Sequence, residues 1–360
     1  GFPDTDGPSE GLDAAVDAIN RGVNQYPPGR GDPDLRAAIG EHQQRWYSIE
    51  LDADREVVVP AGATEALAGA LLGMLDPGDE VVVFEPIYDS YLANIAMAGA
   101  TAVPVLLEPG GDGRWHFDAD ELTGAVSDRT KLILLNTPHN PTGKVFDADE
   151  LARIAAVAIE HDLIVVADEV YEHLVFDGSV HTPICTLPDM FERTLSISSG
   201  GKTFHTTGWK IGWMTGPAEL VDAATLAKQF LTFTNGAPFQ PATAVGLRLG
   251  DEYFDRLRSD LQVARDRLAD GRERCGFTTY RPEASYFVTV DVSSIGFDGD
   301  AVDFCRRLPE IAGVVAVPAS AFYVRPEHGA NLVRFACCKR LAVIDAAVEQ
   351  LLAAFVGEAS

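Results

Sequence analysis

Residues 196–213 read SISSGGKTFHTTGWKIGW, a stretch in which an apolar strand ends in small residues and then presents a lysine. That lysine is Lys202, and a second cation, Lys210, follows eight residues later. Small, apolar neighbours remove water from an amine, which lowers the pKa of Lys202 and makes it nucleophilic. Lys210 lowers that pKa further and can bind a phosphate group. Taken alone, the stretch is equally compatible with a glycine-rich surface loop that carries two solvated lysines.

Short apolar runs and helical patterns alternate around this stretch. We expect strands at residues 57–59, 80–84, 102–107, 131–136, 163–168, 194–197 and 211–215, with helices between them at about 64–75, 89–97 and 147–160. Strands this apolar are buried on both faces, so the pattern predicts an α/β fold with a mainly parallel sheet between helix layers. After about residue 217 the pattern changes, and a smaller α+β part is expected. Its elements are helices at 252–274, 300–307 and 343–355 and strands at 286–290 and 332–336.

The composition limits the classes of partner. Of the 360 residues, 46% are hydrophobic and 23% charged, as in a folded globular protein. The formal net charge is −26. A surface this acidic repels phosphate backbones and anionic lipids, so neither nucleic acid nor a membrane is expected as a partner. There is no apolar run long enough for a membrane span, and the first residues lack the pattern of a signal peptide.

The cysteines and histidines predict no metal or disulfide framework. The five cysteines are scattered and form no CxxC pair, which fits a reducing cytoplasm. His161, His173 and His181 show no metal-ligand spacing, so we expect no metal.

Three loops that follow predicted strands carry further candidates. Residues 136–143 read NTPHNPTG, Asp168 comes directly after five apolar residues, and residues 62–67 read GATEAL at a strand-to-helix turn. Ligand-binding loops of parallel sheets lie at such strand ends, a buried carboxylate needs a cation, and free N–H groups at a helix N-terminus can hold a phosphate. Each loop also has a plain structural interpretation, as a turn or a helix cap. The GATEAL turn lacks the glycine spacing of a dinucleotide or nucleoside triphosphate site.

Together these motifs resemble the class I/II pyridoxal-phosphate-dependent aminotransferases of fold type I, over essentially the whole chain. The branch that the chain resembles most holds actinobacterial N-succinyldiaminopimelate aminotransferases, kynurenine and glutamine aminotransferases, and cysteine-conjugate β-lyases. The segments that carry this resemblance are FPD at 2–4, NQYPPG at 24–29, EPIYDSY at 85–91, DEVYEHLVF at 168–176 and GWKIGW at 208–213.

The resemblance implies a two-domain fold. A large α/β domain, residues 25–255, would hold pyridoxal 5′-phosphate on a mainly parallel seven-stranded sheet between helices. Residues 1–24 and 256–360 would form a smaller α+β domain.

The resemblance also implies the role of each site residue. Lys202 matches the lysine that forms the Schiff base, and an amine is the common side chain that condenses reversibly with an aldehyde. Asp168 matches the aspartate paired with the pyridine nitrogen, whose charge keeps the ring an electron sink. Tyr171 and Asn140 match the donors to the phenolate oxygen. Tyr88 matches the aromatic ring stacked on the pyridine face.

The phosphate and the substrate have their own matches. The phosphate is implied to lie against Ala63, Thr64, Ser199 and Lys210, with Tyr26 reaching it from the neighbouring subunit of a homodimer. Tyr26 alone is also compatible with a turn aromatic that packs on its prolines. Arg334 matches the arginine that clamps the substrate α-carboxylate, with Asn140 beside it and a backbone contact from Gly1.

The implied activity is transfer of an amino group between an L-amino acid and a 2-oxo acid, through a pyridoxamine intermediate. Substrates favoured by the resemblance are N-succinyl-LL-diaminopimelate and glutamate. Alternatives are a kynurenine- or glutamine-type aminotransferase, a cysteine-conjugate β-lyase and, more distantly, a cofactor-sensing regulator. A substrate with extra carboxylates needs a second cationic site, for which Arg21, His205 and Arg325 are candidates.

Overall fold

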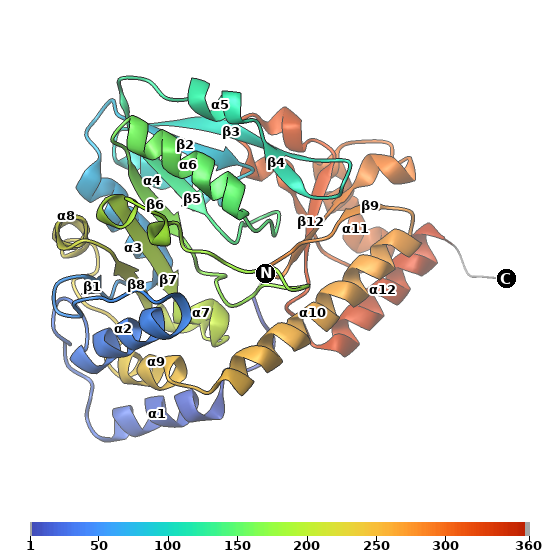
Figure 1. The fold of residues 1–360 in the computed structure, drawn as a ribbon. Coiled ribbons are helices and arrows are strands. Elements are labelled where there is room, and N and C mark those ends of the chain that lie inside the picture. The colour runs from blue at the N-terminus through green and yellow to red at the C-terminus, as the bar shows by residue number, and fades with distance from the viewer. Residues whose placement is uncertain (1, 357–360) are drawn as a thin grey trace.

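The computed structural model describes residues 2–356 and contains two sheets (Figure 1). The larger sheet has eight strands in the order β1-β8-β7-β6-β5-β2-β3-β4. Their bounds are β1 (Val57–Val58), β2 (Glu80–Glu85), β3 (Thr101–Pro109), β4 (Trp115–Phe117), β5 (Thr130–Asn136), β6 (Ile164–Asp168), β7 (Thr194–Ser199) and β8 (Gly212–Thr215). Strands β3, β2, β5, β6 and β7 run parallel, while β8, β1 and β4 are antiparallel to their neighbours. The predicted α/β class and mainly parallel sheet are confirmed.

The sheet has one strand more than the seven predicted. Strand β4 pairs with β3, with Leu107 opposite Phe117, after a turn that contains three glycines. Three residues are too few to show the alternation that predicts a strand, so only the pairing defines β4.

Helices cover both faces of this sheet (Figure 1). On one face Val81, Leu132 and Val166 share a core with Leu67 of α3. On the other face Val82, Ile133 and Val165 share a core with Ile154 of α6. Successive strand residues point to opposite faces, so apolar runs without alternation are what a two-sided core requires. The helices of this part are α2 (Pro33–Tyr47), α3 (Gly62–Met74), α4 (Ser90–Met97), α5 (Ala119–Gly124), α6 (Ala148–Glu160), α7 (Gly200–Thr203), α8 (Ala218–Lys228) and α9 (Phe239–Leu247).

Polar residues mark where these helices begin. Asp147 accepts from the N–H groups of Asp149 and Glu150, and Glu150 bonds back to the N–H of Asp147, forming a capping box at α6. Asp32 caps α2 by accepting from the N–H groups of Asp34 and Leu35, and Pro33 follows in the first turn.

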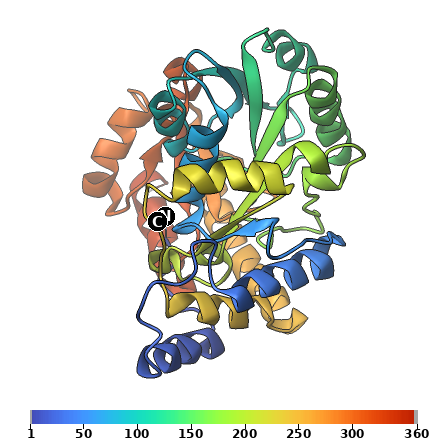
Figure 2. The same cartoon turned by 90° about the vertical axis from the view of Figure 1, so that its left-hand side faces the viewer.

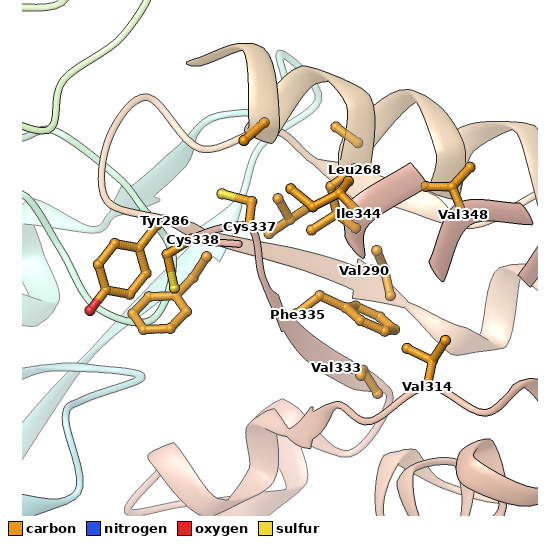
Figure 3. Close-up of a cluster of buried hydrophobic side chains, with 14 of the residues drawn as sticks. Leu268, Tyr286, Val290, Val314, Val333, Phe335, Cys337, Cys338, Ile344 and Val348 are labelled. Atoms are coloured by element: carbon orange, nitrogen blue, oxygen red, sulfur yellow. The ribbon is translucent and has the colours of Figure 1, made fainter. Parts of the chain in front are cut away.

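The smaller sheet is antiparallel, in the order β11-β12-β10-β9. Its strands are β9 (Thr278–Tyr280), β10 (Phe287–Asp291), β11 (Val317–Pro318) and β12 (Leu332–Ala336), packed with α10 (Asp251–Arg274), α11 (Ala301–Ala312) and α12 (Leu341–Phe355). Figure 3 shows Leu268 of α10 and Ile344 of α12 against Phe335 of β12 in the core of this part. Tyr286 lies at one end of that cluster, with its hydroxyl directed away from the other labelled side chains.

Helix α1 (Ser9–Asn20) packs on α9 of the larger part, at the lower edge of the molecule in Figures 1 and 2. Helix α10 starts four residues before the predicted boundary at residue 255 and runs without interruption into the smaller part. The division into domains 25–255 and 1–24 with 256–360 stays a prediction. Within the described residues, no helix has both the length and the apolar character needed to cross a membrane.

Candidate active site

A cavity of about 350 Å³ lies where the carboxyl ends of β5, β6 and β7 meet. Its wall contains ten of the twelve predicted site residues: Ala63, Thr64, Tyr88, Asn140, Asp168, Tyr171, Ser199, Lys202, Lys210 and Arg334. These come from segments separated by up to 271 positions in the chain, and only the fold brings them together. Of the other two, Tyr26 does not line the cavity, and Gly1 lies outside the described residues.

The amine of Lys202 is held inside this cavity. Lys202 belongs to α7, the short helix directly after β7, and its Nζ donates to the hydroxyl of Tyr286 at 3.0 Å. It also lies 5.6 Å from the ring centroids of Tyr171 and of Tyr286. Burial lowers the pKa of Lys202 from its ordinary value, the charges of Lys210 and Arg334 lower it further, and Asp168 opposes them. A desolvated amine of this kind is a nucleophile and a proton acceptor.

Asp168 is the last residue of β6, and its carboxyl group is buried. Its Oδ2 accepts from the hydroxyl of Tyr91 at 2.6 Å, and its Oδ1 has a 3.4 Å contact with the N–H of Val170. Burial raises the pKa of Asp168 to about 6, and the Tyr91 hydrogen bond works against that rise. No basic side chain among residues 2–356 lies within ion-pair distance of Asp168. A cationic ring nitrogen would supply the missing partner.

Arg334 of β12 faces this group from the smaller sheet. Its Nη1 donates to Oδ1 of Asn140 at 2.8 Å, and its guanidinium lies 4.0 Å from the ring centroid of Phe287 and 4.3 Å from that of Phe322. Asn140 is itself anchored, because its N–H donates to Oδ1 of Asn136 at 2.7 Å. A planar cation clamped between two rings, with N–H groups to spare, suits bidentate binding of a carboxylate.

The opposite end of the cavity is built for an anion. Ala63 and Thr64 lie in the first turn of α3, whose N–H groups have no partner within the helix. Lys210 Nζ lies 3.4 Å from Oγ1 of Thr64, and Ser199, the last residue of β7 and the N-cap of α7, also lines this cavity. Gly62 has φ +73°, and a Cβ there would lie 3.3 Å from the Lys210 side chain. The glycine therefore lets the cation approach the start of the helix.

Tyr26 is 80% exposed and contacts Phe233, with ring centroids 5.5 Å apart in a T-shaped arrangement. Three apolar side chains in the segment that leads to Phe233 are also exposed: Leu226, Phe230 and Leu231. We call Tyr26, Phe233 and these three residues the exposed aromatic patch. Exposed apolar side chains that are grouped together are typical of a protein–protein contact.

The candidates for a second cationic site do not reach the cavity. Arg325 pairs with the buried Glu85 and with Glu121, and Arg21 is an exposed partner of Asp17. His205 Nδ1 lies 2.8 Å from Oγ1 of Thr5, outside the cavity wall. None of the three lines the cavity in the single chain, and a role for them toward a distal carboxylate stays untested. The positive side chains of the cavity wall are Lys202, Lys210 and Arg334.

Sequence reasoning missed three contacts of the site and one buried cluster. Tyr91, Tyr286 and Phe322 gave no signal of their own, except that Tyr91 ends the EPIYDSY motif. The cluster is His42, Glu172 and His173, whose ligand-type atoms lie within 4.8 Å of one another. His42 Nε2 and His173 Nε2 are hydrogen-bonded at 2.7 Å, and burial lowers the pKa of His42 to about 3. The expectation of no metal stays a prediction.

Comparison with known proteins gives a family match and close relatives. The model of the family "Aminotransferase class I and II" matches residues 1–351. A protein of Mycobacterium tuberculosis named "Probable N-succinyldiaminopimelate aminotransferase" is 48% identical, over 98% of this chain and 90% of that protein. Kynurenine--oxoglutarate transaminase 3 of Mus musculus is 38% identical, over 97% of this chain and 82% of that protein.

Solved structures agree with the sequence matches. The structure of N-succinyldiaminopimelate aminotransferase from Mycobacterium tuberculosis superposes with a TM-score of 0.95 and 49% identity. The match covers 98% of this chain and 91% of that one.

Proposed function

Because the chain belongs to the class I and II aminotransferases, we propose that it transfers amino groups with pyridoxal 5′-phosphate held in the cavity between Asp168 and Lys210. It is an aminotransferase, acting on an amino acid and a 2-oxo acid, as its family and relatives are. The observation that carries the cofactor proposal is the desolvated amine of Lys202 in one cavity with a buried, unpaired Asp168.

The residues of the cavity fit each part of the cofactor. Thr64, Lys210 and the start of α3 offer donors and positive charge for a phosphate. Lys202 offers an amine for an aldehyde, and Asp168 offers Oδ1, which has only a 3.4 Å contact with the N–H of Val170, to a protonated ring nitrogen. Tyr171 is a hydrogen-bond donor, because burial raises its pKa well above the ordinary value and keeps its hydroxyl protonated.

When bound, pyridoxal phosphate supplies an electron sink for the negative charge that forms at the substrate Cα. Arg334 holds the α-carboxylate and so orients the Cα–H bond. When it is not bonded to the cofactor, the Nζ of Lys202 accepts the proton from the substrate Cα. The same amine gives this proton back to complete the amino transfer. Asp168 keeps its negative charge opposite the ring nitrogen, and Tyr91 favours that charged form. Phe287 and Phe322 keep Arg334 in place and exclude water from its faces.

The proposed assembly is a homodimer in which Tyr26 of one subunit reaches the phosphate of the other. The exposed aromatic patch supports this arrangement, because Phe230 is 82% exposed and Tyr26 80% exposed in the single chain. Burying such side chains against a second copy removes apolar area from water. A cytoplasmic location stays a prediction that rests on the cysteine pattern.

The proposed substrates are N-succinyl-LL-diaminopimelate and glutamate. The relative with that substrate in its name supports this choice at 48% identity. A kynurenine-type or other aromatic substrate is the second candidate. It is favoured by Tyr88, Phe287 and Phe322 in the cavity wall and by the lack of a fourth basic side chain in that wall among the described residues. Elimination at Cβ, as in a β-lyase, begins with the same proton removal.

The first experiment is an absorption spectrum of the purified protein with pyridoxal phosphate, before and after excess L-glutamate. We expect a visible band that is lost on adding glutamate. A band that persists would keep the cofactor but remove glutamate as the donor, and L-kynurenine would be tried next. Absence of any band would overturn the cofactor proposal. Pyruvate release from a cysteine conjugate would identify β-elimination.

A further inference from the structure

Tyr286 is a buried residue that touches the amine of Lys202 from the other sheet. Lys202 follows β7 of the eight-stranded sheet, while Tyr286 directly precedes β10 of the four-stranded sheet. The Tyr286 side chain is 1% exposed, yet its hydroxyl accepts a hydrogen bond from Lys202 Nζ at 3.0 Å. Figure 3 shows Tyr286 at one end of the labelled hydrophobic side chains, with its hydroxyl pointing away from them.

The backbone around Tyr286 is held on both sides. Ser285 has φ +67°, an unusual conformation for a residue other than glycine, and its N–H donates to the carbonyl of Leu174 at 2.8 Å. The carbonyl of Tyr286 accepts from the N–H of Cys337 at 2.8 Å. The ring meets that of Tyr171 at 5.4 Å in a T-shaped arrangement. Tyr286 is therefore fixed relative to both neighbouring elements, and its hydroxyl has little freedom to move.

Tyr286 and Phe287 are consecutive residues, and each contacts one basic side chain of the site, Lys202 or Arg334. Tyr286 contacts the Lys202 amine, and the next residue, Phe287, lies under the guanidinium of Arg334 at 4.0 Å. Tyr286 precedes the strand, and its ring lies beside that of Phe287, with centroids 4.8 Å apart, so the start of β10 carries both contacts. Arg334, which holds the substrate carboxylate, and Lys202, which moves the substrate Cα proton, are thus both contacted by this short segment.

A lysine amine needs such a support. Lysine has four rotatable bonds, and a freed amine loses precision unless a partner restricts it. Among the described residues, Tyr286 is the hydrogen-bond acceptor recorded for Lys202 Nζ. Charged or titratable groups on all sides also act on that amine: Asp168, Tyr171, Lys210, Arg334, Cys338 and Tyr286 itself.

We propose that Tyr286 is a positioning residue that holds the Lys202 amine whenever that amine is not bonded to the cofactor, in place to exchange a proton with the substrate Cα. The proposal rests on the proposed function, because it concerns the proton transfer assigned there to Lys202. The hydroxyl accepts from the amine and takes no part in bond making. It stabilises the charged ammonium and restricts where the neutral amine can go.

The first test needs no bound cofactor. Reductive methylation of the full chain with formaldehyde and a borane, followed by mass spectrometry of the Lys202 peptide, gives the pH midpoint of Lys202 reactivity. Tyr286→Phe removes the hydroxyl and keeps the ring. Loss of an acceptor destabilises the ammonium, so we expect the midpoint to fall by about 1 pH unit and Lys202 to react faster at neutral pH.

The second test uses the protein loaded with pyridoxal phosphate. The substrate is the amino acid that removes the wild-type visible band fastest, with hydrogen or deuterium at Cα. In Tyr286→Phe we expect the single-turnover rate to fall about 10- to 100-fold and the deuterium isotope effect to rise, with the KM for the amino acid within about twofold. An amine that reacts faster with a small reagent but transfers the Cα proton more slowly is one that has lost its position.

Tyr253→Phe is the matched control. Its hydroxyl donates to the carbonyl of Thr203, the residue after Lys202, at 2.7 Å, so it tests loss of a partly buried hydroxyl beside the same helix. We expect both the methylation midpoint and the isotope effect to match the wild type, and thermal melting is measured for both variants.

An unchanged methylation midpoint or an unchanged isotope effect in Tyr286→Phe would overturn the proposal. Equal changes in Tyr253→Phe would do so as well, since they would show a general loosening. A wild-type protein that gives no visible band with pyridoxal phosphate would instead contradict the proposed function. The methylation result would still report whether Tyr286 acts on the Lys202 amine.

Discussion

Arg334 Nη1 donates to Oδ1 of Asn140 at 2.8 Å, and this bond joins the smaller sheet to the loop after β5 across the cavity. The residues are 194 positions apart in the chain. The bond uses one nitrogen of the guanidinium, and Arg334 and Asn140 line the same cavity as Lys202. The bond therefore ties Arg334 of the smaller sheet to the larger sheet at the cavity that also holds the Lys202 amine.

We expect Arg334→Lys to raise the KM for the amino acid about 10- to 100-fold. A lysine keeps the charge but loses the planar fork and the stacking on Phe287 and Phe322. Steady-state kinetics over a range of amino acid concentrations measures the effect. Arg306→Lys on the exposed face of α11 is the control and should leave KM unchanged. An unchanged KM in Arg334→Lys would remove the clamp role.

Lys202→Ala should abolish turnover while leaving the fold intact. The side chain is partly buried and makes one hydrogen bond, so its loss changes stability by only about 1 kcal/mol. Activity and the visible band with pyridoxal phosphate are measured together with thermal melting. Lys131→Ala, at an exposed position of β5, should retain both. Retained transamination by the Lys202 variant would overturn the assignment of the amine.

Tyr91→Phe should weaken cofactor binding at neutral pH. The Tyr91 hydrogen bond lowers the pKa of Asp168, which burial raises to about 6, so removing it raises the pKa of Asp168 further. Less of the carboxylate is then charged near pH 7. The dissociation constant of pyridoxal phosphate is measured against pH, and the midpoint at which affinity is lost on acidification should move up by about 1 unit. Tyr323→Phe, another buried tyrosine, should leave the midpoint where it is.

Phe230→Asp should convert a homodimer into a monomer. Phe230 is 82% exposed in the exposed aromatic patch, and a charge there cannot be buried against a second copy without a large cost. Sedimentation velocity measures the mass, and cofactor affinity should fall with it if Tyr26 of the partner reaches the phosphate. Val180→Asp, at a 73% exposed residue that is not part of the patch, is the control. A dimer that survives Phe230→Asp would place the interface elsewhere.

Stability should fall as the pH drops below about 6.5, and His42 should account for part of the fall. Burial lowers the pKa of His42 from 6.5 to about 3. Between these two pH values, His42 is protonated in the unfolded chain and neutral in the folded chain. The stabilisation is complete above pH 6.5 and is lost as the pH falls towards 3, at about 1.4 kcal/mol per pH unit for this group. Urea unfolding at pH 7 and pH 5 measures it.

His42→Gln keeps a side chain that can hydrogen-bond His173 and removes the titration. We expect a smaller loss of unfolding free energy between pH 7 and pH 5 than in the wild type. An equal loss in both proteins would mean that other groups set the acid limit. His161→Gln, at the C-terminal cap of α6, is the control.

Much of the fold followed from local pattern. The apolar runs at 131–136 and 163–168 became β5 and β6, and the long polar helix expected at 252–274 became α10 at Asp251–Arg274. Strand β4 was missed because three residues carry no periodicity, and its identity depends on pairing with β3. The family assignment, the α/β class and the aminotransferase activity are confirmed. The roles of the site residues stay predictions.

The sequence by itself determined which residues could do the chemistry. Lys202, Asp168 and Asn140 each stand at a strand end in a motif that reads locally, because small residues, apolar runs and asparagine–proline turns act over a few positions. The tertiary structure decided which partners these residues meet. Tyr286 reaches Lys202, Tyr91 reaches Asp168, and Arg325 is taken up by Glu85 instead of the cavity. Those contacts join residues that are 77 to 240 positions apart in the chain. A local sequence pattern does not determine which of two distant segments will pack against each other.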